Sequence, residues 1–290
     1  MKILSIILIV ILTMINPITI TAQDSANGLK ISGFGFWVQE IPKNGKSLLQ
    51  LKHAWLIGEK TLSDDLEIKA FLAFQGPPKI IHTLALKWKK PFAGINYLRA
   101  GRFEPPFGHG TNYYRIDRNP TIYYSAIDQP VVARSNGIEI AGTIDSLEWK
   151  LGAFSGERLL GNINISDDGK WDIYPLFRYT FSNLLSCGLS QRFGPVYAGG
   201  VNAVSQINPL SLQLEVEAIT SKDTINYSIL SIYQPLSWLK VVARYENIKS
   251  ENQLTPGFII YLPHDWEIKG NAVVDKNGLK IVLGQFILRW

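Results

Sequence analysis

The chain has 290 residues, a formal net charge of +5 and one cysteine, and its mean hydropathy is +0.06. This mild charge excludes the strongly basic surface that nucleic-acid binding requires. The lone Cys187 excludes an internal disulfide. A hydropathy near zero is common in soluble proteins, but it is also typical of membrane β-barrels, whose strands alternate apolar and polar residues. Composition therefore leaves one large β domain or two small ones open.

The N-terminal residues 1–23 predict a cleaved signal peptide. Lys2 precedes an apolar stretch, residues 3–15, that is shorter than the roughly 20 residues a spanning helix needs. Small residues around Thr21 and Ala22 follow it. An uncleaved membrane anchor is the alternative. We expect residues 24–290 to form the mature domain.

From residue 29 onward, apolar residues recur at every second position, which predicts β-strands with one apolar and one polar face. In the segment 212–218, Leu214 and Val216 fall on one face. Glu215 and Glu217 fall on the other. The sixteen expected strands lie near residues 29–39, 47–59, 66–74, 80–88, 96–103, 136–142, 147–155, 171–180, 186–193, 196–205, 211–220, 224–233, 239–247, 257–262, 266–274 and 279–290.

The connections between these strands are alternately tight and long. The two longest run through residues 104–135 and 156–170. This segregation predicts an all-β, transmembrane antiparallel β-barrel of about 16 strands with both termini in the periplasm. Tryptophan supports it, because aromatic rings gather at the headgroup layer. Five tryptophans fall at strand ends that share the tight turns: Trp88, Trp149, Trp238, Trp266 and Trp290.

The last expected strand carries a candidate membrane-insertion signal. Phe286, Leu288 and Trp290 lie on one face, and the chain ends on the last of them. A terminal aromatic behind alternating apolar residues resembles the signal that outer-membrane insertion machinery recognises. We therefore expect the barrel-insertion machinery and outer-membrane lipid as partners, and the bacterial cell outer membrane as the location.

Residues 98–110 read Leu-Arg-Ala-Gly-Arg-Phe-Glu-Pro-Pro-Phe-Gly-His-Gly. The two prolines cannot donate ladder hydrogen bonds, so the strand must stop there. This segment resembles the phosphate-selective porin O and P family, and segments 51–56, 134–140, 151–156 and 266–290 resemble it too. The resemblance implies an outer-membrane porin and its assembly as a homotrimer. Its motif positions are Gly101, Phe103, Pro106, Phe107 and Gly108.

By the same resemblance, the 104–135 loop folds into the barrel and narrows it; an external flap is the alternative. An anion-selective pore needs Arg or Lys at its constriction. The candidates are Arg99, Arg115, Arg118 and Arg134. Other basic residues expected on the inner face are Lys52, Lys69, Lys87, Lys150, Arg178, Lys240, Arg244, Lys269 and Lys280. Acidic residues share that face and are expected to pair with them: Glu67, Glu139, Glu148, Glu215, Glu217, Glu246 and Glu267.

Nothing in the sequence favours an enzyme, a metal site or a cofactor. The histidines form no metal-type pair, and no nucleotide or hydrolase motif is present. Ser125 and His109 on the long loop are the weak exception. The sequence therefore predicts passive diffusion of small hydrophilic solutes, with a possible preference for anions. The alternative is a non-conducting barrel that serves as a structural anchor or adhesin.

Overall fold

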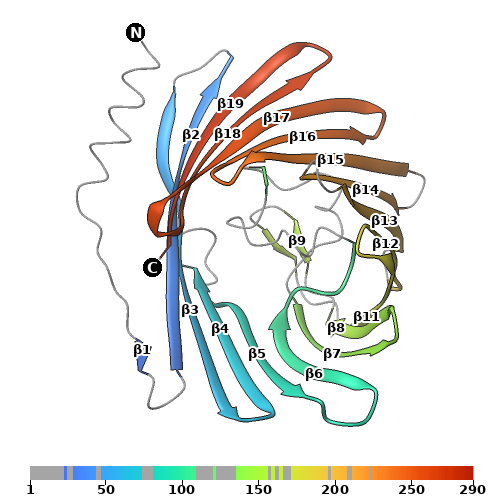
Figure 1. Ribbon diagram of the computed structural model, residues 1–290. Coiled ribbons are helices and arrows are strands. Elements are labelled where there is room, and N and C mark those ends of the chain that lie inside the picture. The colour runs from blue at the N-terminus through green and yellow to red at the C-terminus, as the bar shows by residue number, and fades with distance from the viewer. Residues whose placement is uncertain are drawn as a thin grey trace.

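The computed structural model folds the described chain almost entirely into antiparallel β-strands (Figure 1). Apart from Gln23, the predicted signal peptide lies outside the described residues, as does Trp290. Within the described part, no helix is long and apolar enough to cross a membrane. The residues described are 23–24, 29–43, 47–73, 81–108, 120–121, 135–155, 158–160, 163–165, 171–194, 197–207, 211–221 and 224–289.

Among the described residues there are nineteen strands, and three of them are short: β1 (Gln23–Asp24), β9 (Arg158–Leu160) and β10 (Ile163–Ile165). The sequence analysis missed these three. The remaining sixteen correspond one to one to the expected strands. They are β2 (Leu29–Pro42), β3 (Leu48–Ser63), β4 (Leu66–Ala73), β5 (Ile81–Lys89), β6 (Ile95–Phe103), β7 (Ser135–Ile144), β8 (Leu147–Ser155), β11 (Trp171–Ser182), β12 (Leu185–Arg192), β13 (Ala198–Ile207), β14 (Leu212–Ser221), β15 (Thr224–Leu236), β16 (Leu239–Ile248), β17 (Glu251–Leu262), β18 (Trp266–Asp275) and β19 (Gly278–Arg289).

The sheet closes on itself. Each long strand pairs antiparallel with the long strands before and after it, β8 pairs with β11, and the last strand, β19, pairs with β2. The two-residue β1 adds to β2. Each long strand therefore has a partner on both sides, which removes the free edges that an open sheet would expose. The β9–β10 hairpin is a separate sheet and projects within the ring of strands in Figure 1.

Over much of the ring the two faces of the sheet have opposite chemistry, and the more polar face is the buried one, although an apolar cluster lines the interior near β2, β3 and β19. On β14, Glu215 and Glu217 are buried, whereas Val216 between them is 46% exposed. On β5, Leu84 and Leu86 are exposed and alternate with buried neighbours. This arrangement is the reverse of that in a soluble protein, where apolar residues are buried. A closed sheet explains it, because its polar face lines the interior and its apolar face points outward. Such an outer face fits a lipid environment.

The two ends of the barrel differ in their connections. One end, here called the turn end, carries tight turns such as Asp64–Asp65 and Asp145–Ser146. The other, the loop end, carries the predicted excursions 104–135 and 156–170. Asp145 has a φ of 50°, which suits a two-residue hairpin. The expected tryptophan rim is present at the turn end for Trp88, Trp149, Trp238 and Trp266.

Strand β17 is the expected strand that differs most from its predicted bounds. It begins at Glu251 rather than near residue 257, because Lys249 and Ser250 alone form the hairpin that joins it to β16. Both turn residues have positive φ, as in a type I′ turn. Pro256 pairs with Ala243 but coincides with a gap in the β17–β18 ladder. In the sequence, a proline suggests that a strand has ended. A strand can nevertheless contain a proline where its hydrogen-bond ladder to a neighbour is interrupted.

Gly101 on β6 occupies a position that only glycine fits. Its φ is +130°, and a Cβ there would lie 2.2 Å from the backbone oxygen of Leu84 on β5. Both the left-handed backbone and the close strand approach exclude a side chain. The motif glycine is therefore explained by local geometry.

We expect Val216→Lys to destabilise the folded barrel in lipid by about 2–4 kcal/mol, because it places a charge mid-strand on the outer face. Gln213→Lys is the matched control, since it adds the same charge to the inner face of the same strand, beside Glu215. Denaturant unfolding in lipid vesicles measures both. Equal destabilisation of the two variants would contradict the assignment of the faces.

We expect Gly101→Ala to lose at least about 1–3 kcal/mol of stability through backbone strain, in addition to the overlap with Leu84. Gly58→Ala on β3 is the control, because a Cβ there meets nothing within 4 Å. The folded fraction after heating can be read from the heat-modifiable electrophoretic mobility of each variant. A Gly101→Ala protein as heat-resistant as Gly58→Ala would refute the steric argument.

Candidate functional site

The chain leaves β6 as a short buried segment along the inner wall. This segment, Glu104–Gly108, is here called the strap. Pro105, Pro106, Phe107 and Gly108 are all buried. The prolines lack N–H groups, so the ladder ends at Phe103 as predicted. Of the predicted 104–135 loop, only the strap, residues 120–121 and Ser135 are described, and Arg115, Arg118 and Arg134 lie outside the described residues.

The strap packs into an aromatic cluster near the loop end. Phe103 and Phe154 meet edge to face at 5.0 Å between ring centroids, and Phe154 meets Tyr174 at 5.5 Å. Phe107 of the strap adds a third such contact, with Tyr174 at 6.5 Å. These rings come from β6, β8, β11 and the strap, and small or aliphatic residues complete the cluster: Ala85, Ala198 and Ile219. Edge-to-face pairs favour one fixed arrangement, so the strap is held against the wall.

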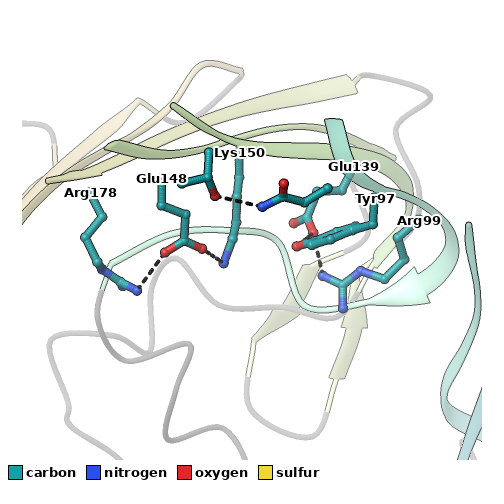
Figure 2. Close-up of polar contacts among 8 residues, drawn as sticks. Tyr97, Arg99, Glu139, Glu148, Lys150 and Arg178 are labelled. Atoms are coloured by element: carbon teal, nitrogen blue, oxygen red, sulfur yellow. Dashed lines mark hydrogen bonds and ion pairs between the residues drawn. The ribbon is translucent and has the colours of Figure 1, made fainter. Parts of the chain in front are cut away.

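Closer to the turn end, charged side chains replace the aromatic ones. Figure 2 shows Glu139 of β7 accepting hydrogen bonds from Tyr97 and Arg99 of β6. The donor–acceptor distances are 2.8 Å from the Tyr97 hydroxyl and 2.9 Å from the Arg99 guanidinium. The same guanidinium lies 3.8 Å from the ring centroid of Phe103. Arg99 is therefore fixed by a carboxylate and an aromatic ring together.

A second carboxylate on this wall has two basic partners. Glu148 of β8 lies 2.9 Å from the Lys150 ammonium and 3.4 Å from the Arg178 guanidinium of β11 (Figure 2). Lys87 of β5 lies 4.6 Å above the Tyr97 ring, and among the described residues no carboxylate forms an ion pair with it. Lys87, Arg99, Lys150 and Arg178, here called the basic arc, share the interior with two carboxylates, Glu139 and Glu148. The charges of these six residues sum to +2, and Glu67 of β4, which faces Lys87 in register, is paired with Lys89.

The opposite wall is more acidic. Glu215 and Glu217 of β14, Glu246 of β16 and Glu267 of β18 are all buried on the inner face. Lys269 lies 3.6 Å from Glu267 and is itself buried. Buried charges need partners, and each of these residues has them. The expectation that opposite charges on the inner face pair with one another is met by several pairs: Lys69 with Glu59, Lys89 with Glu67, Arg99 with Glu139, and Lys269 with Glu267.

One residue expected on the inner face, Lys280, does not fit that expectation. Lys52 and Lys280 both lie at register shifts, of the β2–β3 and β18–β19 ladders respectively. Lys280 is largely exposed and lies 3.8 Å from Asp275 near the loop end. A bulged residue leaves the strict alternation of faces, and that is why counting by twos misplaced Lys280.

Sequence reasoning missed the polar residues that meet the strap. Ser190 of β12 accepts a hydrogen bond from the backbone N–H of Gly108 at 2.9 Å. Beside it, Arg192 and Asp172 form a buried ion pair at 2.6 Å. The partners are 82 and 20 residues apart. Only the alternation of β12, which puts residues 190 and 192 on one face, could have indicated that they share the interior.

Of the proposed insertion residues, Phe286 lies on the opposite, outer face of β19, and Trp290 lies outside the described residues. Phe286 packs between Trp37 of β2 and Trp266 of β18, with ring centroids 6.5 and 6.1 Å away. The backbone of Leu288 pairs with Gly35. Within the described residues, no group of three His, Cys, Asp or Glu side chains could hold a metal ion.

Solved structures share this fold. A variant of the Rhodopseudomonas blastica porin with two introduced tryptophans has a TM-score of 0.63 and 8% identity, covering 90% of this chain and 100% of its own. A second variant of that porin, in which basic and acidic residues are replaced by alanine, has a TM-score of 0.61, 10% identity and the same coverage. No family model matches the chain, and no curated protein matches it. The resemblance to the phosphate-selective porin O and P family thus stays a prediction, whereas the fold is that of a porin barrel.

Proposed function

We propose that this chain is a bacterial outer-membrane porin that lets small hydrophilic solutes diffuse passively. One observation carries the proposal. Sixteen strands close into a ring, its inner face bears buried charged residues, and its outer face is mostly apolar. Barrels of about sixteen strands are wide enough to leave an aqueous channel. A wall of fixed charges keeps such a channel wetted, because charged side chains retain water.

The same proposal covers export and assembly. Residues 1–23 would direct the chain out of the cytoplasm as a signal peptide. Phe286, Leu288 and Trp290 would be read by the barrel-insertion machinery, and the apolar outer face would then contact outer-membrane lipid. Assembly as a homotrimer is the expectation drawn from the family resemblance. Chemical crosslinking of the detergent-solubilised protein tests it directly.

A non-conducting anchor or adhesin is the second candidate, and the aromatic cluster favours it. Phe103, Phe107, Phe154 and Tyr174 pack together inside the loop end, where a wide pore would be open. Reconstitution into planar lipid bilayers separates the two functions. Stable single-channel current steps support the porin, and the absence of conductance from correctly folded protein supports the anchor. An enzymatic role would rest on Ser125 and His109, which lie outside the described residues.

Within the porin proposal, we infer a mild preference for anions. The basic arc places four cations on one wall beside two carboxylates, and Lys87 contacts a tyrosine ring instead of an acid. Basic side chains at a narrow point favour anions. Arg99 is the arc residue nearest the strap, because its guanidinium contacts Phe103 where the strap begins. Arg115, Arg118 and Arg134 are proposed to add to this field from the long loop.

We expect Lys87→Gln to lower the anion-to-cation permeability ratio by about twofold. A unit charge about 7 Å from a passing ion contributes roughly 0.6 kcal/mol in water, before screening by salt. Lys60→Gln is the control, because Lys60 is an exposed residue on the outward-facing positions of β3. Reversal potentials in a salt gradient across a bilayer give the ratio. Cation selectivity of the unmodified protein would overturn the anion preference while leaving the porin function intact.

A further inference from the structure

The far end of the strap is hydrogen-bonded to the barrel wall through a buried hydroxyl. Ser190 is fully buried, and its Oγ accepts a hydrogen bond from the Gly108 N–H at 2.9 Å. The same Oγ donates to the carbonyl oxygen of Gly200 on β13 at 3.5 Å. Ser190 thus uses its one donor and an acceptor lone pair to join the strap to two adjacent strands.

Two glycines of the wall, Gly200 and Gly152, leave room for the strap. A Cβ added to Gly200 would lie 2.9 Å from the Ser190 Oγ and 3.4 Å from the Phe107 ring. A Cβ added to Gly152 on β8 would lie 3.2 Å from the Pro106 ring. These are contacts tighter than ordinary packing. Because Gly200 has no side chain, it leaves room for both the Phe107 ring and the Ser190 hydroxyl. This space is here called the socket.

The strap has little slack. From β6 to β12 the sheet takes four steps, through β7, β8 and β11, which is about 19 Å at roughly 4.8 Å per step. The five Cα–Cα steps from Phe103 to Gly108 reach at most about 18 Å when extended, and they suffice because the straight path inside the closed ring is shorter than the path along its curved wall. Pro105 and Pro106 stiffen this stretch. Such a nearly extended segment is held at the wall by its two ends and by the packing of Phe107 on Tyr174.

From these contacts we infer that Ser190 is a positioning residue that latches the strap to the wall and thereby sets the free cross-section of the channel at the loop end. The inference rests on the proposed porin function. With the latch made, Phe107 stays in its socket and the long loop leaves the wall from a fixed point, Gly108. Without it, the far end of the strap loses one of its attachments and moves over a wider range, so the path for ions fluctuates more.

The contact itself is tested by hydrogen–deuterium exchange of the folded full-length protein. Because Pro105 and Pro106 carry no amide hydrogen, the strap has only three exchangeable amides, and Gly108 contributes one of them. We expect Ser190→Ala to accelerate exchange at Gly108 on the order of tenfold, through loss of one buried hydrogen bond. Ser186→Ala is the matched control, since Ser186 lies on the same face of β12, toward the turn end. Unchanged exchange in Ser190→Ala would overturn the latch.

The role of Ser190 in the channel is tested by single-channel recording. Gly200→Val is a second variant, which fills the socket. We expect Ser190→Ala and Gly200→Val to change the open-channel conductance and to increase current noise. Gly199→Val should behave like the unmodified protein, because a Cβ there meets only ordinary contacts at 3.6 Å. Heat-modifiable mobility confirms that each variant is folded.

The two proposals fail in different ways. If the unmodified protein conducts and neither Ser190→Ala nor Gly200→Val alters its current, the latch role is overturned and the porin stands. If the unmodified protein does not conduct, the porin falls, and the channel role of Ser190 falls with it. Faster exchange at Gly108 would in that case still support the contact between Ser190 and the strap.

Discussion

Closure of the hydrogen-bonding ladder is the constraint on which the rest of this structure depends. In a lipid environment, every backbone N–H and C=O must find a partner within the protein, because no water is available. The pairing of β19 with β2 meets that requirement at the two ends of the sheet. Once the ring is closed, each strand has an inside and an outside. Because polar and apolar residues alternate in the sequence, the charged side chains then face the interior and the apolar side chains face outward.

The seam between β2 and β19 is stabilised on both of its faces. Inside, Leu283 and Ile287 of β19 belong to a buried cluster with Val38 and Trp55. Outside, Phe286 is held between two tryptophan rings. The terminal strand thus combines a proposed recognition role with a structural one. Phe286, a residue of the proposed insertion signal, is thus also part of the packing at the seam that closes the ring.

Phe103 links the two parts of the interior. Its ring packs against Phe154 in the aromatic cluster and against the Arg99 guanidinium of the basic arc. It is also the last residue of β6 before the strap begins. The position of the strap and the orientation of a proposed selectivity residue are therefore coupled through one side chain. Movement of the strap would change both the width of the channel and the field within it.

The sequence by itself determined the sixteen long strands, their two faces, the tryptophan rim and the end of β6 before Pro105. These features are local, since they depend on alternation and on the missing N–H of proline. Local signals failed at register shifts such as that of Lys280, and at Pro256, because a bulge or a gap in one ladder depends on the neighbouring strand.

Only the tertiary structure decided what lies opposite what. It joined β8 to β11 across the 156–170 excursion, placed Ser190 and Gly200 at the end of the strap, and paired Arg192 with Asp172. A serine and a glycine carry no periodic signal, and their partners are set by the curvature and register of a closed sheet. The alternation of residues in the sequence is enough to predict a closed sheet. The contacts across its interior depend on the register and curvature of that sheet, which only the tertiary structure gives.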